Sequence, residues 1–341
     1  MKTYVVGVCA IALALGVSFL PAPGFAAEPV FKLKYASFMP SMHKVSLLSD
    51  EWCKEVQKRT NGRVKVSYFS SGTLVSANQM YDGVVKGVID IGFSVISYTP
   101  GRFPLTEGLY QPLGVKTAYQ ATKMANAFYQ KYKPKEFDDV KLFYLHQNGP
   151  GYIHTKKPVK KLADLKGLRI KSDAQTALIV TALGATPTTM PMLETYDALK
   201  RGLADGVILG SETLQGFKFG DVCKNTYINY GATYSATFWI AMNKEKWNSL
   251  PKDIQQIIDK LNEEWVERQG RLWDQLDEEF FTLAKKTDHQ VFYATPEEQA
   301  IAAQKVRSIF DTYVKNTKEK GLPGEEAMIW AMEYLKTAPL K

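Results

Sequence analysis

Cysteine and histidine are scarce in this sequence, with three cysteines and four histidines among 341 residues. Three cysteines cannot build the dense disulfide framework of a small secreted scaffold. The histidines are not spaced with one another, or with cysteines or carboxylates, as metal sites require. The sequence also lacks the nucleophile elbow of α/β-hydrolases and the P-loop of nucleotide-binding proteins. We therefore expect a binding protein without metal or other cofactor, and not an enzyme.

Long apolar runs are absent after the first 20 residues. A positive start at Met1 and Lys2 precedes an uncharged apolar run from Tyr4 to Leu20, and residues 24–26 fit a small-x-small cleavage site. This order is typical of a secretory signal peptide, predicted here over residues 1–26. The alternative is a membrane anchor, but the run falls short of the ~20 residues that span a bilayer. We expect the mature chain, residues 27–341, to lie in the periplasm.

Two cysteines, Cys53 and Cys223, lie in the predicted mature chain. An exported protein could pair them in a disulfide. They are 170 residues apart, and sequence alone cannot bring them to bridging distance, so a disulfide and two buried thiols both remain open.

The formal net charge is +8, and loss of Lys2 with the signal peptide leaves +7. Nucleic-acid binders gather lysine and arginine on one face with aromatic residues between them. Here the basic residues alternate with Asp and Glu on amphipathic helical segments, which indicates a solvated surface. We expect no nucleic-acid partner, although a positive field can gather small anions.

Short apolar runs typical of strands alternate with amphipathic helical runs along most of the chain. This alternation predicts an α/β protein with mainly parallel sheets flanked by helices. The predicted strands are residues 31–36, 64–68, 89–95, 140–145, 168–171, 206–209 and 237–242.

An internal repeat indicates two lobes of similar plan. Tyr81-Asp82 is followed by Gly87 and Asp90, and the same Y-D-x4-G-x2-D pattern recurs 115 residues later, from Tyr196 to Asp205. In each copy a helix ends at glycine and a turn feeds an apolar strand. We expect lobe I at about residues 30–145 with part of 230–341, and lobe II at about 146–235 with part of the C-terminal helices. Ligands of open α/β sheets bind beyond the carboxyl ends of the strands, so two facing lobes create a cleft.

The C-terminal third carries one long amphipathic segment from Pro251 to about Thr287. At ~1.5 Å per residue it would measure roughly 55 Å, enough to span both lobes. The alternative is two helices with a break near Gly270. A last helix is predicted over residues 325–336.

Several motifs together resemble one family, the periplasmic substrate-binding subunits of tripartite ATP-independent periplasmic (TRAP) transporters. The most characteristic segment is Leu-Ala-Asp-Leu-Lys-Gly-Leu-Arg-Ile-Lys at 162–171. The resemblance covers essentially the whole mature chain. Its other segments are residues 101–105, 157–159, 183–187, 196–206 and 247–251.

The resemblance implies a receptor that closes around a small organic anion by hinge bending and docks on a small and a large membrane subunit. Such receptors usually grip the ligand carboxylate with an arginine on the strand after the Asp-Leu-Lys-Gly turn. Lys171 occupies the matching position here, so we expect Lys171 to bind the anion. Arg169, two residues earlier, could supply the missing guanidinium.

The other ligand positions implied by the resemblance are mostly apolar. An apolar lining disfavours a sugar acid, whose hydroxyls need partners, and favours a ligand with a flat or apolar body and one anionic group. Gly151, where some members carry a second arginine, would leave room for a ring. The expected site residues besides Lys171 and Arg169 are Phe38, Val95, Tyr98, Asn148, Gly151, Met192, Leu209, Ser211, Glu212 and Trp239.

These predictions leave alternatives open. Phe38, Val95, Met192 and Leu209 could be ordinary core residues, Ser211 and Glu212 could cap the following helix, and only one of Phe238 and Trp239 can face the cleft. The best prediction for the ligand is an aromatic or apolar monocarboxylate. A small hydroxy or keto acid, a sulfonate, a ligand-presenting sensor protein and a periplasmic lyase are the alternatives.

Overall fold

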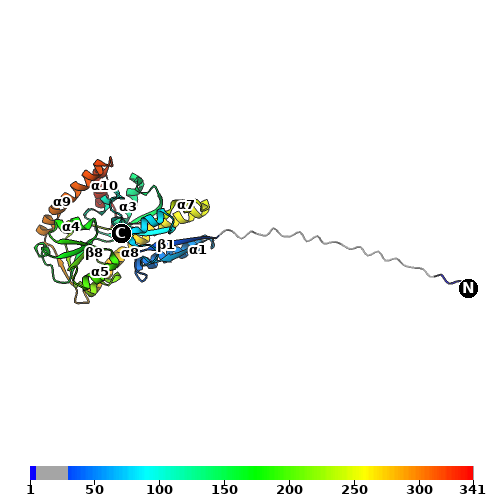
Figure 1. Ribbon diagram of the computed structural model, residues 1–341, viewed down its shortest axis with the longest axis horizontal. Helices are drawn as coiled ribbons and strands as arrows, with labels where there is room; N and C mark the ends of the chain where they lie inside the picture. The colour runs from blue at the N-terminus through cyan, green and yellow to red at the C-terminus, as the bar shows by residue number, and fades with distance from the viewer. Residues whose placement is uncertain (5–29, 341) are drawn as a thin grey trace.

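The computed structural model describes residues 1–4 and 30–340. In this part of the chain, two β-sheets lie next to each other and each is flanked by helices (Figure 1). The predicted α/β fold with two lobes is confirmed. The predicted signal peptide falls almost entirely on residues 5–29, which lie outside the described residues. Among the described helices, none is long and apolar enough to cross a membrane.

The first sheet has the strand order β2-β1-β3-β10-β4. β2 and β3 both pair in parallel with β1, whereas β10 runs antiparallel to its neighbours β3 and β4. Its strands are β1 (Phe31–Ser37), β2 (Val64–Phe69), β3 (Ile91–Val95), β4 (Val140–Gln147) and β10 (Thr237–Asn243).

The second sheet has the order β11-β9-β5-β8-β6-β7, and β5 is its one antiparallel strand among the described residues. Both sheets are therefore mainly parallel, as predicted. Its strands are β5 (Gly151–Thr155), β6 (Arg169–Ser172), β7 (Thr186–Thr189), β8 (Gly206–Gly210), β9 (Asn225–Ile228) and β11 (Gln290–Tyr293).

Helices cover the faces of both sheets, with α1 and α3 on the first lobe and α4 and α5 on the second (Figure 1). The helices are α1 (Lys44–Arg59), α2 (Met80–Val85), α3 (Ala118–Tyr132), α4 (Thr176–Ala182), α5 (Met192–Lys200), α6 (Thr213–Gly216), α7 (Lys244–Asn248), α8 (Lys252–Ala284), α9 (Pro296–Glu319) and α10 (Gly324–Thr337).

The chain crosses between the sheets twice through short segments, from β4 to β5 and from β9 to β10. It leaves the first sheet after β4 and returns to it from β9 to β10, and the two crossing segments are joined where Gly151 N donates to Tyr234 O at 2.8 Å. The strand that follows each crossing, β5 or β10, is the antiparallel one. These adjacent crossings are where a hinge between the lobes would lie.

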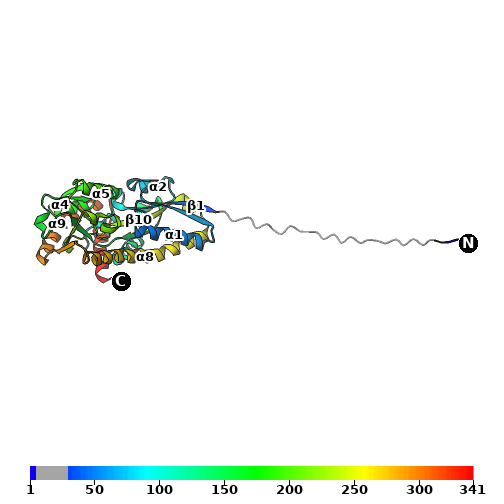
Figure 2. The ribbon, with the colours of Figure 1, turned by 90° about the horizontal axis from the view of Figure 1, so that it is seen from below.

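Helix α8 runs along one side of the molecule past both sheets (Figure 2). Its 33 residues are continuous, so the alternative of a break near Gly270 is wrong. Gly270 serves close packing instead, because a Cβ there would lie 2.9 Å from Tyr119 Cα of α3. Further along the helix, the rings of Phe280 and Phe281 contact His154 and Tyr152 of β5.

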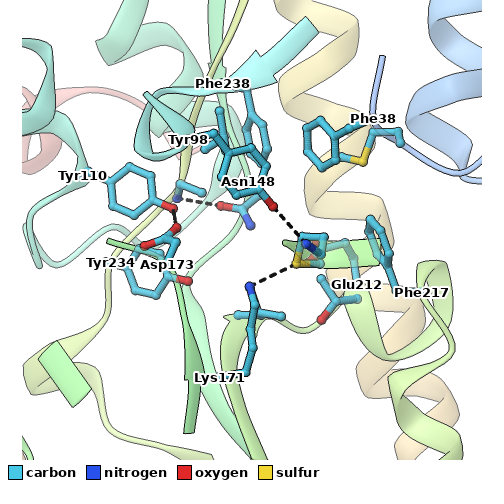
Figure 3. A pocket seen from close by; sticks show the side chains of 16 residues that line it. Phe38, Tyr98, Tyr110, Asn148, Lys171, Asp173, Glu212, Phe217, Tyr234 and Phe238 are labelled. Carbon is cyan, nitrogen blue, oxygen red and sulfur yellow. Dashed lines mark hydrogen bonds between the residues drawn. The ribbon is translucent and has the colours of Figure 1, made fainter. Parts of the chain in front are cut away.

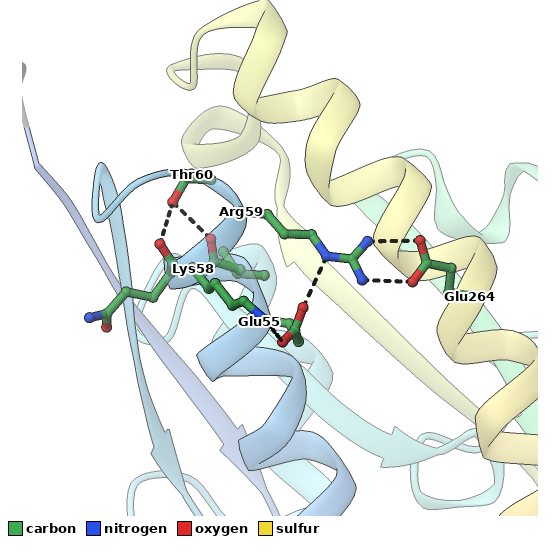
Figure 4. Close-up of polar contacts among 7 residues, drawn as sticks. Glu55, Lys58, Arg59, Thr60 and Glu264 are labelled. Atoms are coloured by element: carbon green, nitrogen blue, oxygen red, sulfur yellow. Dashed lines mark hydrogen bonds and ion pairs between the residues drawn. The ribbon is translucent and has the colours of Figure 1, made fainter.

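The first half of α8 is tied to α1 by paired polar contacts (Figure 4). Arg59 donates from its two terminal nitrogens to the two carboxylate oxygens of Glu264 at 2.7 Å each, and from Nε to Glu55 Oε2 at 3.1 Å. Deeper in the interface, Trp52 Nε1 donates to Asn262 Oδ1 at 3.0 Å. The bidentate ion pair is partly exposed, so its contribution lies more in orientation than in stability.

The sequence repeat has the same geometry in both lobes. Gly87 and Gly202 take positive φ values of 70° and 77° after α2 and α5, as helix-terminating glycines do. The repeat aspartates then accept a backbone N–H from the neighbouring strand: Asp90 Oδ2 from Lys34 at 2.7 Å and Asp205 Oδ2 from Arg169 at 2.9 Å. The repeated residues therefore build one turn twice.

Cys53 and Cys223 are both buried free thiols. Burial raises the pKa of the Cys223 thiol to about 12. Of the two possibilities left open by the sequence, the structure has the unpaired one.

Candidate functional site

A cavity lies between the two lobes, where the carboxyl ends of their parallel strands meet (Figure 3). About 430 Å³ of space there is not filled by protein atoms, and part of that space is open solvent. The lining residues are Phe38, Met39, Val95, Tyr98, Tyr110, Asn148, Lys171, Asp173, Met192, Leu209, Glu212, Thr213, Phe217, Tyr234, Ala236 and Phe238.

Lys171 supplies the one cation among these lining residues. It lies on β6, its side chain is 1% exposed, and its Nζ contacts Met192 Sδ at 3.4 Å, a weak acceptor. Burial lowers the pKa of Lys171 to about 8, and the nearby Asp173 acts in the opposite direction. Within residues 1–4 and 30–340 this buried ammonium has no stronger acceptor, and an anion would supply the missing partner.

Six of the sixteen residues that line the cavity are aromatic, and five more are apolar. Phe38 packs edge-to-face on Tyr98, with ring centroids 5.6 Å apart. The Phe238 ring stacks on His146 and on Trp273, with ring centroids 5.0 Å and 5.6 Å apart. Two aromatic residues outside the cavity lining therefore hold this ring in place. Burial lowers the pKa of His146 to about 3, so the imidazole in this stack is neutral. The wall offers flat apolar surfaces and adds no second cation.

The two lobes are joined by hydrogen bonds beside the cavity. Ser97 Oγ and the Tyr110 hydroxyl, both from the first lobe, donate to Asp173 Oδ2 of the second lobe, the former at 2.9 Å. Tyr98 OH of the first lobe accepts the Met192 backbone N–H, at the start of α5, at 3.1 Å. These bonds hold the lobes together around the cavity.

Most polar groups of the lining are already engaged by protein atoms. Asp173 Oδ1 accepts from the backbone N–H groups of residues 175 and 176 and from a threonine hydroxyl. Asn148 Oδ1 accepts from the Ala236 N–H at 2.8 Å, and Tyr234 OH donates to the Ile208 carbonyl at 3.0 Å. Glu212 differs, because its Oε2 is buried and has no hydrogen-bond partner in the described part of the chain.

Eight of the twelve predicted site residues line this cavity. They are Phe38, Val95, Tyr98, Asn148, Lys171, Met192, Leu209 and Glu212. Arg169, Gly151, Ser211 and Trp239 are not among the lining residues.

Arg169 is exposed and bound to the repeat turn. Its guanidinium donates to both oxygens of Asp205 and to the Gly202 carbonyl, so it stabilises the lobe II copy of the turn. The prediction that it could replace a ligand-binding arginine is not met, because these bonds direct it away from the cavity.

Trp239 and Ser211 point away from the cavity for different reasons. On β10, Phe238 faces the cavity, and the alternation of side chains places Trp239 on the other face, against Tyr81 at 5.1 Å. The Ser211 hydroxyl donates to Asp277 of α8. Neither Ser211 nor Glu212 caps α6 through its side chain, so that alternative is also wrong.

Gly151 leaves no room for a ligand ring. A Cβ at Gly151 would lie 2.2 Å from Cε1 of Tyr234, whose ring fills that space and stacks on Tyr110 at 5.4 Å. The glycine is required so that the Tyr234 ring can reach the cavity wall. The expectation of an open space at this position is therefore wrong.

Sequence reasoning missed several lining residues. Asp173 lies two residues after Lys171 on the same face of the chain, and that spacing could have indicated it. Tyr110 ends a short 3-10 helix, Phe217 directly follows α6 and Tyr234 lies between β9 and β10. Such short segments carry little periodic pattern, so only the tertiary structure brings these residues to the cavity.

Two α/β lobes of the same plan, joined by paired crossing segments around a cavity with one buried cation, define a two-lobed solute-binding protein. Residues 36–316 match the model of the bacterial extracellular solute-binding proteins, family 7, and the chain belongs to this family.

Two of the similar solved structures are TRAP solute-binding proteins, which confirms the predicted resemblance. The protein from Rhodoferax ferrireducens T118, in complex with copurified benzoate, is 28% identical, with a TM-score of 0.84 over 90% of this chain and 98% of that chain. The protein from Bordetella bronchiseptica, with bound (R)- and (S)-mandelate, is 28% identical, with a TM-score of 0.83 over 89% and 98%.

A similar relative is the 2,3-diketo-L-gulonate-binding periplasmic protein YiaO of Escherichia coli, 28% identical over 215 residues. That match covers 60% of this chain and 63% of the relative, slightly less than two thirds of its length.

Proposed function

We propose that this protein is the periplasmic solute receptor of a TRAP transporter and that it captures an aromatic monocarboxylate between its lobes. The observation that carries the proposal is the cavity itself, in which one buried cation, Lys171, lies among six aromatic and five other apolar side chains. The cation balances one carboxylate, and the rings provide flat apolar contact for the rest of the ligand.

The composition of the wall separates this ligand class from a sugar acid. A polyhydroxylated ligand needs a hydrogen-bond partner for each hydroxyl, and unmet polar groups in a closed site cost a few kcal/mol each. Asn148, Asp173 and Tyr234 are engaged within the protein, which leaves few partners for several hydroxyls. Structural relatives with bound benzoate and mandelate support the same class.

The receptor would release its ligand unchanged to a small and a large membrane subunit, as the family resemblance implies. Recovery of unmodified ligand after prolonged incubation with the protein would support a receptor, and conversion of the ligand would indicate an enzyme.

A thermal-shift screen tests the ligand class. A ligand that binds only the native state raises the melting temperature by mass action, so benzoate, hydroxybenzoates, phenylacetate and mandelate are expected to raise it. Glucuronate and galacturonate serve as the sugar-acid arm, pyruvate and lactate as the small-acid arm, and benzenesulfonate as the sulfonate arm. Stabilisation by sugar acids alone would contradict the proposal.

The affinity for an aromatic acid is expected to be constant below about pH 8 and to fall above it. Burial lowers the pKa of Lys171 to about 8, so the free protein loses this cation above that pH, while the bound carboxylate favours the charged form. Loss of this one proton should lower the affinity by up to about tenfold per pH unit, and ionisation of the Glu212 carboxyl in the same cavity, whose pKa is raised to about 8, acts in the same direction. Calorimetric titrations between pH 6 and 10 measure this profile, and a flat profile through pH 9 would contradict the role of Lys171.

A further inference from the structure

One polar group of the cavity has no role in holding a simple carboxylate. Glu212 follows β8 and is 4% exposed, and its Oε2 is buried without a hydrogen-bond partner among the described residues. A buried polar atom left unsatisfied destabilises the protein, so its retention in a ligand cavity calls for a partner supplied by the ligand.

The local backbone directs this carboxyl group to its position. Gly210 ends β8, and a Cβ at this glycine would lie 2.3 Å from Glu212 Oε2 and 2.8 Å from Asn148 Nδ2. The absence of a side chain at position 210 lets the Glu212 carboxyl fold back over the strand end. In Figure 3, Lys171 and Glu212 both come from the second lobe and lie on the same side of the cavity, opposite Phe38 and Phe238.

The charge state of this group suits a site for anions. Burial raises the pKa of Glu212 to about 8 and Asp277 of α8 raises it further, whereas hydrogen bonding of the carboxyl group to the backbone N–H groups of Glu212 and Thr213 and to the Asn148 amide acts in the opposite direction. Near neutral pH the group is therefore mostly a carboxylic acid, which does not repel an anionic ligand and has one O–H to donate as well as oxygens that accept.

We propose that Glu212 is a specificity-determining residue that hydrogen-bonds a hydroxyl group of the ligand, so that the preferred ligand is a hydroxylated aromatic monocarboxylate. This inference rests on the proposed function, because it assigns the carboxylate to Lys171 and the hydroxyl to Glu212. A hydroxyl both donates and accepts, so it can satisfy the buried Oε2, whereas an unsubstituted ring leaves that atom without a partner.

The test compares ligand pairs that differ by one hydroxyl, on protein variants that differ in one side chain. Benzoate is paired with 2-, 3- and 4-hydroxybenzoate, and phenylacetate is paired with mandelate. Together these ligands offer the hydroxyl group to Glu212 from several positions. Calorimetry at pH 7 measures Kd for the wild type, Glu212→Gln and Glu212→Leu. Glu107→Gln is the matched control, because burial also raises the pKa of Glu107 but this residue does not line the cavity.

The wild type is expected to bind at least one hydroxy acid about tenfold more tightly than its parent acid, the scale of one buried hydrogen bond. Glu212→Leu is expected to reduce that preference to about twofold or less without weakening the parent acid. Glu212→Gln should keep most of the preference, because an amide both donates and accepts. Glu107→Gln should behave as the wild type. Melting curves of the ligand-free variants verify that each is folded.

Other outcomes separate the two proposals. If the wild type binds the parent acids and shows no preference for a hydroxyl, or if the preference survives Glu212→Leu, the inference about Glu212 is wrong and the receptor function stands. If Glu212→Leu weakens both members of each pair equally, Glu212 has a structural role and the inference is again wrong. If the folded wild type binds none of these acids, the proposed ligand class fails and the inference fails with it.

Discussion

Replacing Lys171 by Met is expected to weaken the binding of an aromatic monocarboxylate by about 30- to 100-fold and to stabilise the ligand-free protein at the same time. The loss of affinity corresponds to about 2–3 kcal/mol, the scale of a charge-assisted hydrogen bond in a buried site. The gain in stability arises because Lys171 is a buried cation whose pKa is lowered to about 8, so its removal relieves a cost of about 3 kcal/mol at neutral pH. Calorimetry and thermal melts measure the two effects.

This prediction is specific because Lys171→Met should lower the affinity for the ligand but raise the stability of the ligand-free protein. A merely structural lysine would lower both the melting temperature and the affinity when replaced. Arg169→Met is the matched control, since it removes a cation two residues away on the same strand, where the guanidinium binds Asp205 outside the cavity. Affinity within about twofold of the wild type is expected for that variant. A comparable loss for Arg169→Met and none for Lys171→Met would move the anion site to Arg169.

Replacing Gly151 by Val is expected to destabilise the protein by at least about 1–3 kcal/mol and to abolish most of the ligand binding. A Cβ at this position would overlap Cε1 of Tyr234 at 2.2 Å, and overpacked cores cost energy of this order. The Tyr234 ring cannot move freely, because its hydroxyl donates to the Ile208 carbonyl and its ring stacks on Tyr110. The overlap would therefore deform the cavity wall and the paired crossing segments together.

A second glycine provides the comparison for this effect. Gly83 lies inside α2, where a Cβ would meet the Val75 side chain at 3.3 Å, and alanine would improve the helix propensity. Gly83→Ala is therefore expected to change stability by less than about 1 kcal/mol and to leave binding intact. Chemical unfolding and calorimetry of both variants measure the difference. A Gly151→Val protein that binds like the wild type would show that Tyr234 does not form the wall of the site.

The sequence predicted the architecture because the strongest signals lie in long or repeated patterns. The long amphipathic segment ending in the 280s became the single helix α8, and the Y-D-x4-G-x2-D repeat became the same turn in both lobes. The short strands β7, β9 and β11 were not predicted, since four residues carry little periodicity. In β7, Pro187 reads as a turn residue, yet proline is tolerated there because β7 is an edge strand.

The site was less predictable than the fold. Lys171 was indicated by the family resemblance together with its place on a strand. The sequence could not decide whether Phe238 or Trp239 faces the cavity. Adjacent residues of a strand point to opposite faces, and which face is which depends on how β10 pairs with its neighbours. The role of Gly151 was misjudged, because its partner Tyr234 lies 83 residues away along the chain and no local pattern links the two.

A crystal structure of the protein with benzoate or a hydroxybenzoate bound tests the central claim most directly. The account predicts the ligand carboxylate within about 3 Å of Lys171 Nζ, with the ring between Phe38, Tyr98 and Phe238. A ligand bound with its carboxylate on another cation, or outside the space between the two lobes, would contradict it.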